Sequence, residues 1–412
     1  MNKGPILTLD LNAADAPDPD RKAPFEYGRE LGIDEIVDRQ DEVAEVVRTI
    51  RDGGKLFLIG PRRYGKSSIL KTAVDHLNQK SAIILRIDAE GYPSIDLIVG
   101  AIIALAAQQL TGEAKKAGSL IAQFFSRIRP ELEYNPLENT WSARLGVDIK
   151  RHDHTHLLVE ALNSFERLAQ AQPERRPVGL IIDEFQKIIE LGGQTAEGQI
   201  RAAIQTHKRA GYVFAGSKTH MLTAMTTDAA RPFYRLGGVR FIGPVPRDDF
   251  HRFIKERFKA SGFTAKDEAI TLLMDLAHDV PYNIQMLAHG CWASLRNSGT
   301  RRATLTPEIV AHTLRRLVLQ QDPIYTMLWN RLTSIQQRTL IAVIRLQGRN
   351  LQSARGMAIV GKAPATIRKS IHAMMDTSLL RDEQTPNSTV VVFEDPFFEK
   401  WIEFVILPNL PF

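Results

Sequence analysis

A short loop pattern limits the possible folds of this chain more than any other feature: Gly60-Pro61-Arg62-Arg63-Tyr64-Gly65-Lys66-Ser67. It fits G-x-x-x-x-G-K-[ST], in which two glycines let the loop curl and aim backbone N–H groups at phosphate oxygens. The apolar run Leu56–Ile59 comes directly before the loop, and a helical pattern from Ser67 to about Leu77 follows it. This strand–loop–helix order predicts a phosphate-binding turn, with the N-terminus of the helix facing the anion.

The side chains of this loop match those that bind a nucleotide together with Mg²⁺. Lys66 is expected to place a cation on the β- and γ-phosphates and to act in catalysis, and the Ser67 hydroxyl is a ligand for Mg²⁺. A chance match is the alternative, and the strand and helix on either side argue against it. The residues predicted to hold ATP and Mg²⁺ are Gly60, Pro61, Arg62, Arg63, Tyr64, Gly65, Lys66, Ser67 and Ser68.

Two carboxylates follow a second apolar run, Gly179–Ile182. At the end of such a strand, Asp183 is expected to hold Mg²⁺ through its water shell, and Glu184 to position and polarise the attacking water. Taken alone, the pair fits a solvated turn equally well. Because it follows the phosphate loop in the expected chain order, we predict that Asp183 is a metal ligand and Glu184 a catalytic residue.

A third apolar run, Tyr212–Ala215, ends in Gly216, Ser217 and Lys218. A polar side chain at the end of a strand beside the carboxylates can contact the γ-phosphate or its water. Ser217 is the first candidate for this catalytic role, and Lys218 is the second. An equally good interpretation is that Ser217 caps the next helix.

Two arginines lie just beyond this strand, Arg231 and Arg235. A guanidinium here can stabilise the charge that develops on a transferred phosphoryl group, in a neighbouring subunit where subunits form a ring. For Arg231 the favoured interpretation is a surface arginine or a salt bridge with Asp228. For Arg235 the catalytic and surface roles are equally favoured, so Arg235 is a candidate catalytic residue and a homo-oligomer is a further expectation.

The wider pattern predicts an α/β core followed by helical domains. Between Ile36 and about Ile242, short apolar runs alternate with amphipathic segments, which is typical of βαβ units around a mainly parallel sheet. Helices follow, and near the end of the chain three helices precede two strands, the order of a winged helix-turn-helix. The first of these three is predicted over 325–346. The predicted strands of the core are 55–59, 83–87, 180–182, 212–215 and 239–242. The predicted domains are 1–23, a flexible tail; 24–243, the ATP-binding core; 244–322, a helical domain; and 323–412, the winged helix.

The last domain carries basic residues at the turn and on the second helix of its predicted helix-turn-helix. Lys362, Arg368 and Lys369 are the candidate contacts to double-stranded DNA, since exposed basic side chains on such a helix can reach the major groove. Contact with a protein is an equally good interpretation, because winged helices serve both purposes.

Several of these segments together resemble the AAA-like P-loop ATPases of bacteria and archaea that are related to origin-recognition proteins and to STAND signalling ATPases. The resemblance covers roughly residues 24–400, and it implies that the segment around Arg39 borders the adenine. It also implies a helical lid after the core and a C-terminal winged helix. Besides the phosphate loop, the residues that carry it are Pro24–Gly28, Val37–Glu42, Asp183–Gln186, Phe214–Lys218 and Pro232–Arg235.

The chain departs from that family at the start of a lid helix. Where relatives often have G-x-P, this sequence has Asp279-Val280-Pro281. The residues that follow, Tyr282–Gln285, include no arginine that could reach the phosphates. Contact between the lid and the phosphates is therefore not implied here.

Composition excludes some classes of protein. Cys291 is the only cysteine, so neither a disulfide within the chain nor a four-thiolate zinc site can form. A reducing cytoplasm is the expected location, and we expect no signal peptide and no membrane span. The group His152, His154 and His156 invites a metal site, but the cationic Lys150 and Arg151 beside it disfavour one.

The sequence thus predicts an ATP-hydrolysing switch that couples its nucleotide state to DNA or to a DNA-bound protein. The net charge of +6 permits such a partner without selecting it. The alternative is a STAND-type signalling or defence ATPase whose winged helix makes protein contacts. A regulator that binds nucleotide without turnover is disfavoured by Glu184.

Overall fold

The fold is described from a computed structural model that covers residues 23–78, 82–110, 121–128, 130–145, 154–300, 302–385 and 388–409. It divides into two compact units. One spans Glu30–Pro244, and the other takes the chain up to Arg29 and again from Val245 onward. The tail predicted over 1–23 lies, apart from its last residue, outside the described residues.

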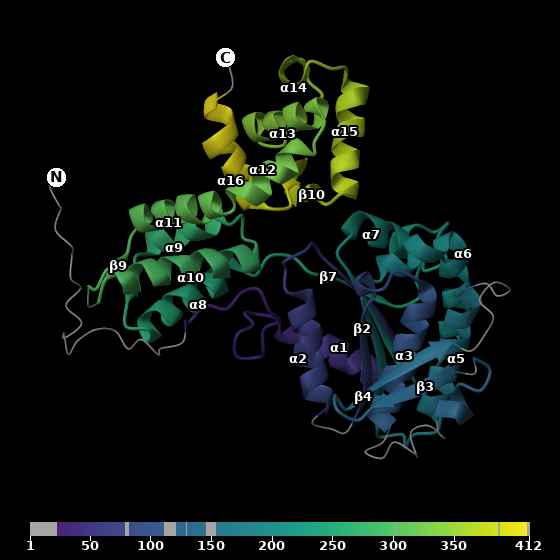
Figure 1. The fold of residues 1–412 in the computed structure, drawn as a ribbon. Coiled ribbons are helices and arrows are strands. Elements are labelled where there is room, and N and C mark those ends of the chain that lie inside the picture. Colours follow the sequence, from purple (N-terminus) through teal and green to yellow (C-terminus); the bar gives the residue numbers. More distant parts are fainter. Residues whose placement is uncertain are drawn as a thin grey trace, which may run out of the picture. The chain divides into compact units, whose positions relative to one another are not determined.

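The first unit is built on a five-stranded parallel sheet with the strand order β2-β5-β6-β1-β7 (Figure 1). All five predicted strands are present, each within two residues of its expected ends. Strands β5 and β6 are buried along their whole length, as expected for inner strands covered on both faces. The strands are β1 (Lys55–Ile59), β2 (Ile83–Asp88), β5 (Val178–Asp183), β6 (Gly211–Gly216) and β7 (Gly238–Phe241).

Helices cover this sheet and leave an aromatic cluster in the core. Phe185 follows directly after the two carboxylates, and its ring centroid lies 4.5 Å from that of Phe214 on β6. Phe57 on β1 packs on the same ring at 5.2 Å. The helices are α1 (Gln40–Arg51), α2 (Lys66–Asn78), α3 (Ile95–Leu110), α5 (His154–Gln170), α6 (Gln186–Ile204) and α7 (Thr219–Thr227), with a 3₁₀ turn η1 over Ala89–Gly91.

An antiparallel hairpin of β3 (Pro130–Asn135) and β4 (Thr140–Leu145) forms a sheet of its own against α3 (Figure 1). It therefore lies outside the five-stranded sheet. In the described part of the chain, no helix has both the length and the apolar character that crossing a bilayer requires.

The second unit begins with four helices: α8 (Arg247–Ala260), α9 (Asp267–Leu276), α10 (Pro281–Asn297) and α11 (Pro307–Gln320). Two short parallel strands, β8 (Thr264–Ala265) and β9 (Thr304–Leu305), lie among them. Phe25 is buried, and its ring centroid lies 4.9 Å from that of Phe258 on α8. Residues up to Arg29 thus group with this unit, and the boundaries of the predicted domains stay a prediction.

The same unit continues with four helices and a hairpin, where three helices and a hairpin were predicted. The single helix predicted over 325–346 is instead two, because Thr333 caps a new helix. Its side chain accepts a hydrogen bond from the Gln336 N–H, and the Gln336 side chain accepts one from the Thr333 N–H. The elements are α12 (Asp322–Asn330), α13 (Ser334–Leu346), α14 (Ala354–Val360), α15 (Pro364–Asp376), β10 (Leu380–Thr385), β11 (Ser388–Phe393), α16 (Pro396–Trp401), a π-helical turn over Ile402–Ile406 and a 3₁₀ turn over Leu407–Asn409.

Candidate nucleotide and metal site

The strand order brings the predicted site residues to one edge of the sheet. Strand β6 lies between β1, which leads into the phosphate loop, and β5, which ends in Asp183. Because all three strands are parallel, their C-terminal ends deliver the loop, the two carboxylates and Ser217 side by side.

Both glycines of the loop are required by its conformation. A Cβ atom on Gly60 would lie 2.7 Å from the carbonyl oxygen of Ile242, which leaves no room for a side chain. Gly65 has a φ of +88°, in the left-handed region that favours glycine. The sequence pattern thus reflects a tight turn that only glycine can make at these two points.

Lys66 begins helix α2, and its side chain folds back over the loop. Its Nζ donates to the carbonyl oxygens of Gly60 at 2.8 Å and Pro61 at 2.9 Å. The residue is 5% exposed. The ammonium group is thus held at the mouth of the loop, where a phosphate oxygen can take the place of these carbonyl acceptors.

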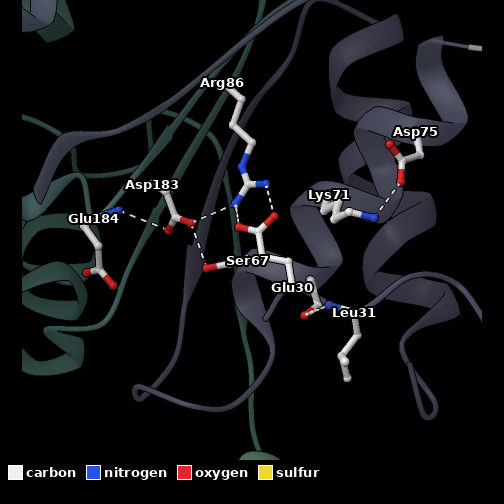
Figure 2. A network of polar contacts seen from close by, with 9 residues as sticks. Glu30, Leu31, Ser67, Lys71, Asp75, Arg86, Asp183 and Glu184 are labelled. Atoms are coloured by element: carbon white, nitrogen blue, oxygen red, sulfur yellow. Dashed lines mark hydrogen bonds and ion pairs between the residues drawn. The ribbon is translucent and has the colours of Figure 1, made fainter. Parts of the chain in front are cut away.

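The two predicted metal ligands are in direct contact. The Ser67 hydroxyl donates to Asp183 Oδ2 at 2.9 Å, although the residues come from different elements (Figure 2). Burial raises the pKa of Asp183, while the hydrogen bond from Ser67 and the positive charges of Arg86 and Lys66 oppose the shift. A hydroxyl and a carboxylate are the hard oxygen donors that Mg²⁺ prefers. The donor set and the cradle of Gly65 and Lys66 therefore fit a nucleotide bound with Mg²⁺.

Glu184 is fixed by donors that converge on one oxygen. The backbone N–H and the hydroxyl of Ser217 donate to its Oε2 at 3.1 and 2.8 Å, and Gln186 Nε2 donates to the same atom. Burial raises the pKa of Glu184, but the charge of Lys66 and the hydrogen bonds from Gln186 and Ser217 outweigh it, so the net shift is downward. The group is therefore an ionised carboxylate at neutral pH.

Ser217 does not cap the following helix. The side chain that could have capped α7 bonds to Glu184 instead, and α7 has no side-chain cap. Lys218, the second candidate, points its Nζ to Glu190 at 2.6 Å in an exposed ion pair. The structure thus brings Ser217, and not Lys218, to the carboxylate at the end of β5.

The other loop residues differ in their surroundings. Tyr64 is buried, whereas Arg62 and Arg63 are exposed. Arg62 Nε lies 3.5 Å from the Ser217 hydroxyl, so it stands over the same end of the sheet. Pro61 is half-buried and supplies one of the carbonyls bonded by Lys66.

Two residues predicted to bind nucleotide make contacts within the protein. Arg39 is 6% exposed, and its guanidinium donates to the Gly243 carbonyl and to Glu42. The Ser68 hydroxyl accepts the backbone N–H of Leu31 at 3.0 Å. Their polar groups hold chain segments together, and their contact with a nucleotide stays a prediction.

The arginines near the end of β6 occupy different environments. Arg231 forms an ion pair with the buried Glu197, with Nη2 2.5 Å from Oε2, so the predicted partner Asp228 is wrong. Asp228 instead accepts the N–H of Ala230. Arg235 is exposed, and its guanidinium lies over the ring of Tyr234 at 5.1 Å.

Three residues that lie at the site were not identified from the sequence: Gln186, Arg86 and Glu30. Gln186 stands two positions after Glu184, and its buried Oε1 has no hydrogen-bond partner among the residues described. Arg86 and Glu30 form an ion pair beside Asp183. An arginine inside the otherwise apolar run of β2 was the available signal, but nothing local identifies its partner.

The predicted DNA contacts Lys362, Arg368 and Lys369 are exposed at and beyond the turn between α14 and α15. Arg368 Nη2 donates to Gln352 Oε1 at 3.0 Å. All three side chains therefore stand on the surface of the unit.

Of the histidine group, the structure describes His154 and His156. His154 begins a helix rather than a strand, and its Nδ1 lies 2.8 Å from both carboxylate oxygens of Asp96. His152 lies outside the described residues. No group of three metal-binding side chains occurs in the part of the chain that the structure describes.

Neither a protein-family model nor a curated protein matches the chain. Solved structures do. The Walker-type ATPase PABY2304 of Pyrococcus abyssi aligns with a TM-score of 0.60 at 15% identity, over 92% of this chain and 99% of that one. The ORC2 protein of Aeropyrum pernix, in its ADPNP–ADP complexes, aligns with a TM-score of 0.51 at 12% identity, over 92% and 96% of the two chains. The chain therefore shares the fold of these two proteins over 92% of its length.

Proposed function

We propose that this protein binds ATP with Mg²⁺ and hydrolyses it. The observation that carries the proposal is the meeting of Ser67 and Asp183 at 2.9 Å, with the ionised Glu184 next in the chain. Two oxygen ligands for a metal and a carboxylate to activate water are the parts that phosphoryl transfer to water requires.

Each residue has a separate task in this proposal. Lys66 leaves the carbonyls of its own loop and binds the β- and γ-phosphates. Ser67 and Asp183 hold Mg²⁺, which neutralises charge on the phosphate oxygens when bound. Three hydrogen bonds to Oε2 of Glu184 hold its carboxylate in place, and the other oxygen, Oε1, is the proposed acceptor for the attacking water.

We further propose that the C-terminal helices α13, α14 and α15 with the β10–β11 hairpin act as a winged helix that binds double-stranded DNA. The support is an uneven distribution of charge: basic residues are concentrated in one segment, although the net charge of the whole chain is only +6. Residues 323–375 contain no Asp or Glu, and every Lys and Arg among them is exposed. The eight basic residues are Arg331, Arg338, Arg345, Arg349, Arg355, Lys362, Arg368 and Lys369.

Such a surface suits a polyanion. Clustered cations bind phosphates by releasing counterions, and a helix after a tight turn can enter the major groove. The acidic residues of this region begin only at Asp376, at the end of α15. The role of Arg235 in a homo-oligomer stays a prediction beside this proposal.

One assay tests both parts. Phosphate release from ATP is measured with Mg²⁺, with EDTA, and with Mg²⁺ plus duplex DNA. Release that needs Mg²⁺ supports the ATPase, and no release in any condition contradicts it. Acceleration by DNA supports the coupling, whereas a DNA-independent rate with no DNA binding favours the signalling alternative.

A further inference from the structure

Two charged side chains, Glu30 and Arg86, form a chain of contacts that ends at Asp183, the candidate metal ligand. Arg86 on β2 makes a two-pronged ion pair with Glu30: Nη1 lies 2.8 Å from Oε2 and Nη2 lies 2.6 Å from Oε1. The same Nη2 lies 3.4 Å from Asp183 Oδ2 (Figure 2). Arg86 therefore stands between two carboxylates and is bound much more closely to the first.

The longer contact, from Arg86 Nη2 to Asp183 Oδ2, involves an oxygen that makes a second hydrogen bond. Asp183 Oδ2 is also the acceptor of the Ser67 hydroxyl, at 2.9 Å. A guanidinium and a metal ion compete for one carboxylate oxygen, because each is a cation that needs its lone pairs. The distance between Arg86 and Asp183 thus bears on how readily the carboxylate can take a metal.

Glu30 is placed to control that distance. The next residue, Leu31, donates its backbone N–H to Ser68 Oγ, which ties the backbone beside Glu30 to the first turn of α2. Planar pairing of both guanidinium nitrogens with Glu30 fixes the direction of the Arg86 fork as well as its position. Arg86 is then held near Asp183 without closing on Oδ2.

We propose that the Glu30–Arg86 pair is a positioning device that sets the metal affinity of Asp183. When no metal is present, the positive charge of Arg86 balances the negative charge of the buried Asp183 carboxylate. The carboxylate then stays turned toward Ser67. Glu30 holds Arg86 back, so that Mg²⁺ does not have to break a full ion pair to reach Oδ2. The inference rests on the proposed function, since it assigns a role toward the same metal.

Removing Glu30 and removing Arg86 have opposite consequences. In Glu30→Gln the guanidinium is free to close on Asp183, so metal binding weakens, by about tenfold on the scale seen for outer partners of metal ligands. In Arg86→Gln the competing cation is gone and metal binding strengthens. In the double variant the loss of Glu30 has little further effect, because Glu30 acts through Arg86.

The test is a titration of the full-length protein with Mn²⁺ in place of Mg²⁺, in the presence of ADP, followed by electron paramagnetic resonance. Asp75→Asn is the matched control, because it breaks the exposed Lys71–Asp75 ion pair on α2, at 3.2 Å, without touching Asp183 (Figure 2). Glu30→Asp keeps the charge and is expected to restore most of the affinity. ADP affinity without metal checks that each variant keeps its fold.

A weaker Mn²⁺ affinity in Glu30→Gln that is absent in the Arg86→Gln background supports the proposal. Equal losses in both backgrounds overturn it, since Glu30 would then act on the metal directly. Wild-type binding of Mn²⁺ with an unchanged Glu30→Gln variant overturns this inference alone. Failure of the wild-type protein to bind Mn²⁺ with ADP overturns both the inference and the proposed function.

Discussion

Ser67 Oγ donates a hydrogen bond to Asp183 Oδ2 at 2.9 Å across 116 positions of sequence. The contact joins the first turn of α2 to the end of β5 and places the two proposed metal ligands side by side. The architecture of the sheet, rather than any local pattern, brings them there. The roles of the surrounding side chains follow from this arrangement, and each can be tested separately.

Lys66 is expected to supply much of the binding energy for ATP. In Lys66→Ala the charge-assisted hydrogen bonds to the phosphates are removed, and each is worth about 1.5–3 kcal/mol, or tenfold and more in Kd. Calorimetry with ATP and Mg²⁺ measures the change. Lys71→Ala on the exposed face of the same helix is the control and should leave Kd unchanged. Equal ATP affinity in Lys66→Ala and the wild-type protein would contradict the role of Lys66.

Ser217 is expected to affect turnover more than binding. Ser217→Ala removes the hydroxyl donor to Glu184 Oε2 and keeps the backbone donor, so kcat should fall by about tenfold while ATP affinity stays the same. Ser217→Thr retains a hydroxyl and should recover most of the rate. Lys218→Met serves as the control for its neighbour. A rate in Ser217→Ala equal to that of wild type would show that Glu184 does not need the hydroxyl donor.

The basic surface of α15 is expected to carry DNA affinity. Reversing both charges in Arg368→Glu and Lys369→Glu should weaken binding steeply, and the log–log salt slope should shrink by roughly 0.9 for each DNA phosphate that is no longer neutralised. ATP binding should not change. The same reversal at Arg252 and Lys259, both exposed on α8, is the control. Anisotropy titrations across salt measure the slopes, and indistinguishable slopes for the wild type and the α15 variant would remove this helix from DNA recognition.

His207 is expected to make stability depend on pH. Burial lowers its pKa to about 4, with Glu166 opposing the shift and Lys55 adding to it. The unfolded chain takes up this proton near pH 6.5, whereas the folded protein does so only near pH 4, so this contribution to stability is lost as the pH falls between these values. Urea unfolding at several pH values should show a smaller acid loss for His207→Gln than for wild type. As a control, His76→Gln at an exposed position should keep the wild-type dependence of stability on pH. If His207→Gln also kept the wild-type dependence, His207 would not be the cause of the acid loss.

The parts of the site that were predictable share a local cause. Gly60, Gly65 and Lys66 act through the conformation and charge of one loop, so their spacing alone identifies them. Asp183 and Glu184 could be identified because an apolar strand delivers both at its end. In each case the residues that identify the motif lie within a few consecutive positions of the sequence.

The parts that were missed depend on partners distant in sequence. Glu30 and Arg86 are 56 positions apart, and only the fold brings them to Asp183. The bond from the Leu31 N–H to the Ser68 hydroxyl likewise spans positions that no local pattern connects. The contact of Phe25 with Phe258 on α8 likewise joins residues that are distant in sequence.

One error was avoidable from sequence. The helix predicted over 325–346 ends and restarts around Thr333, where Thr333 and Gln336 form a capping box. That spacing is a recognised start signal, but the apolar periodicity continues through Leu332 and concealed the break.

The central claim is that Glu184 activates water for ATP hydrolysis at this site. The most direct measurement is the single-turnover rate of phosphate release from ATP with saturating Mg²⁺, in the wild type and in Glu184→Gln. The substitution preserves shape and removes the charge that polarises water. The rate should therefore fall by about 10²-fold or more while ATP affinity is retained. A Glu184→Gln protein that releases phosphate as fast as wild type would contradict the account.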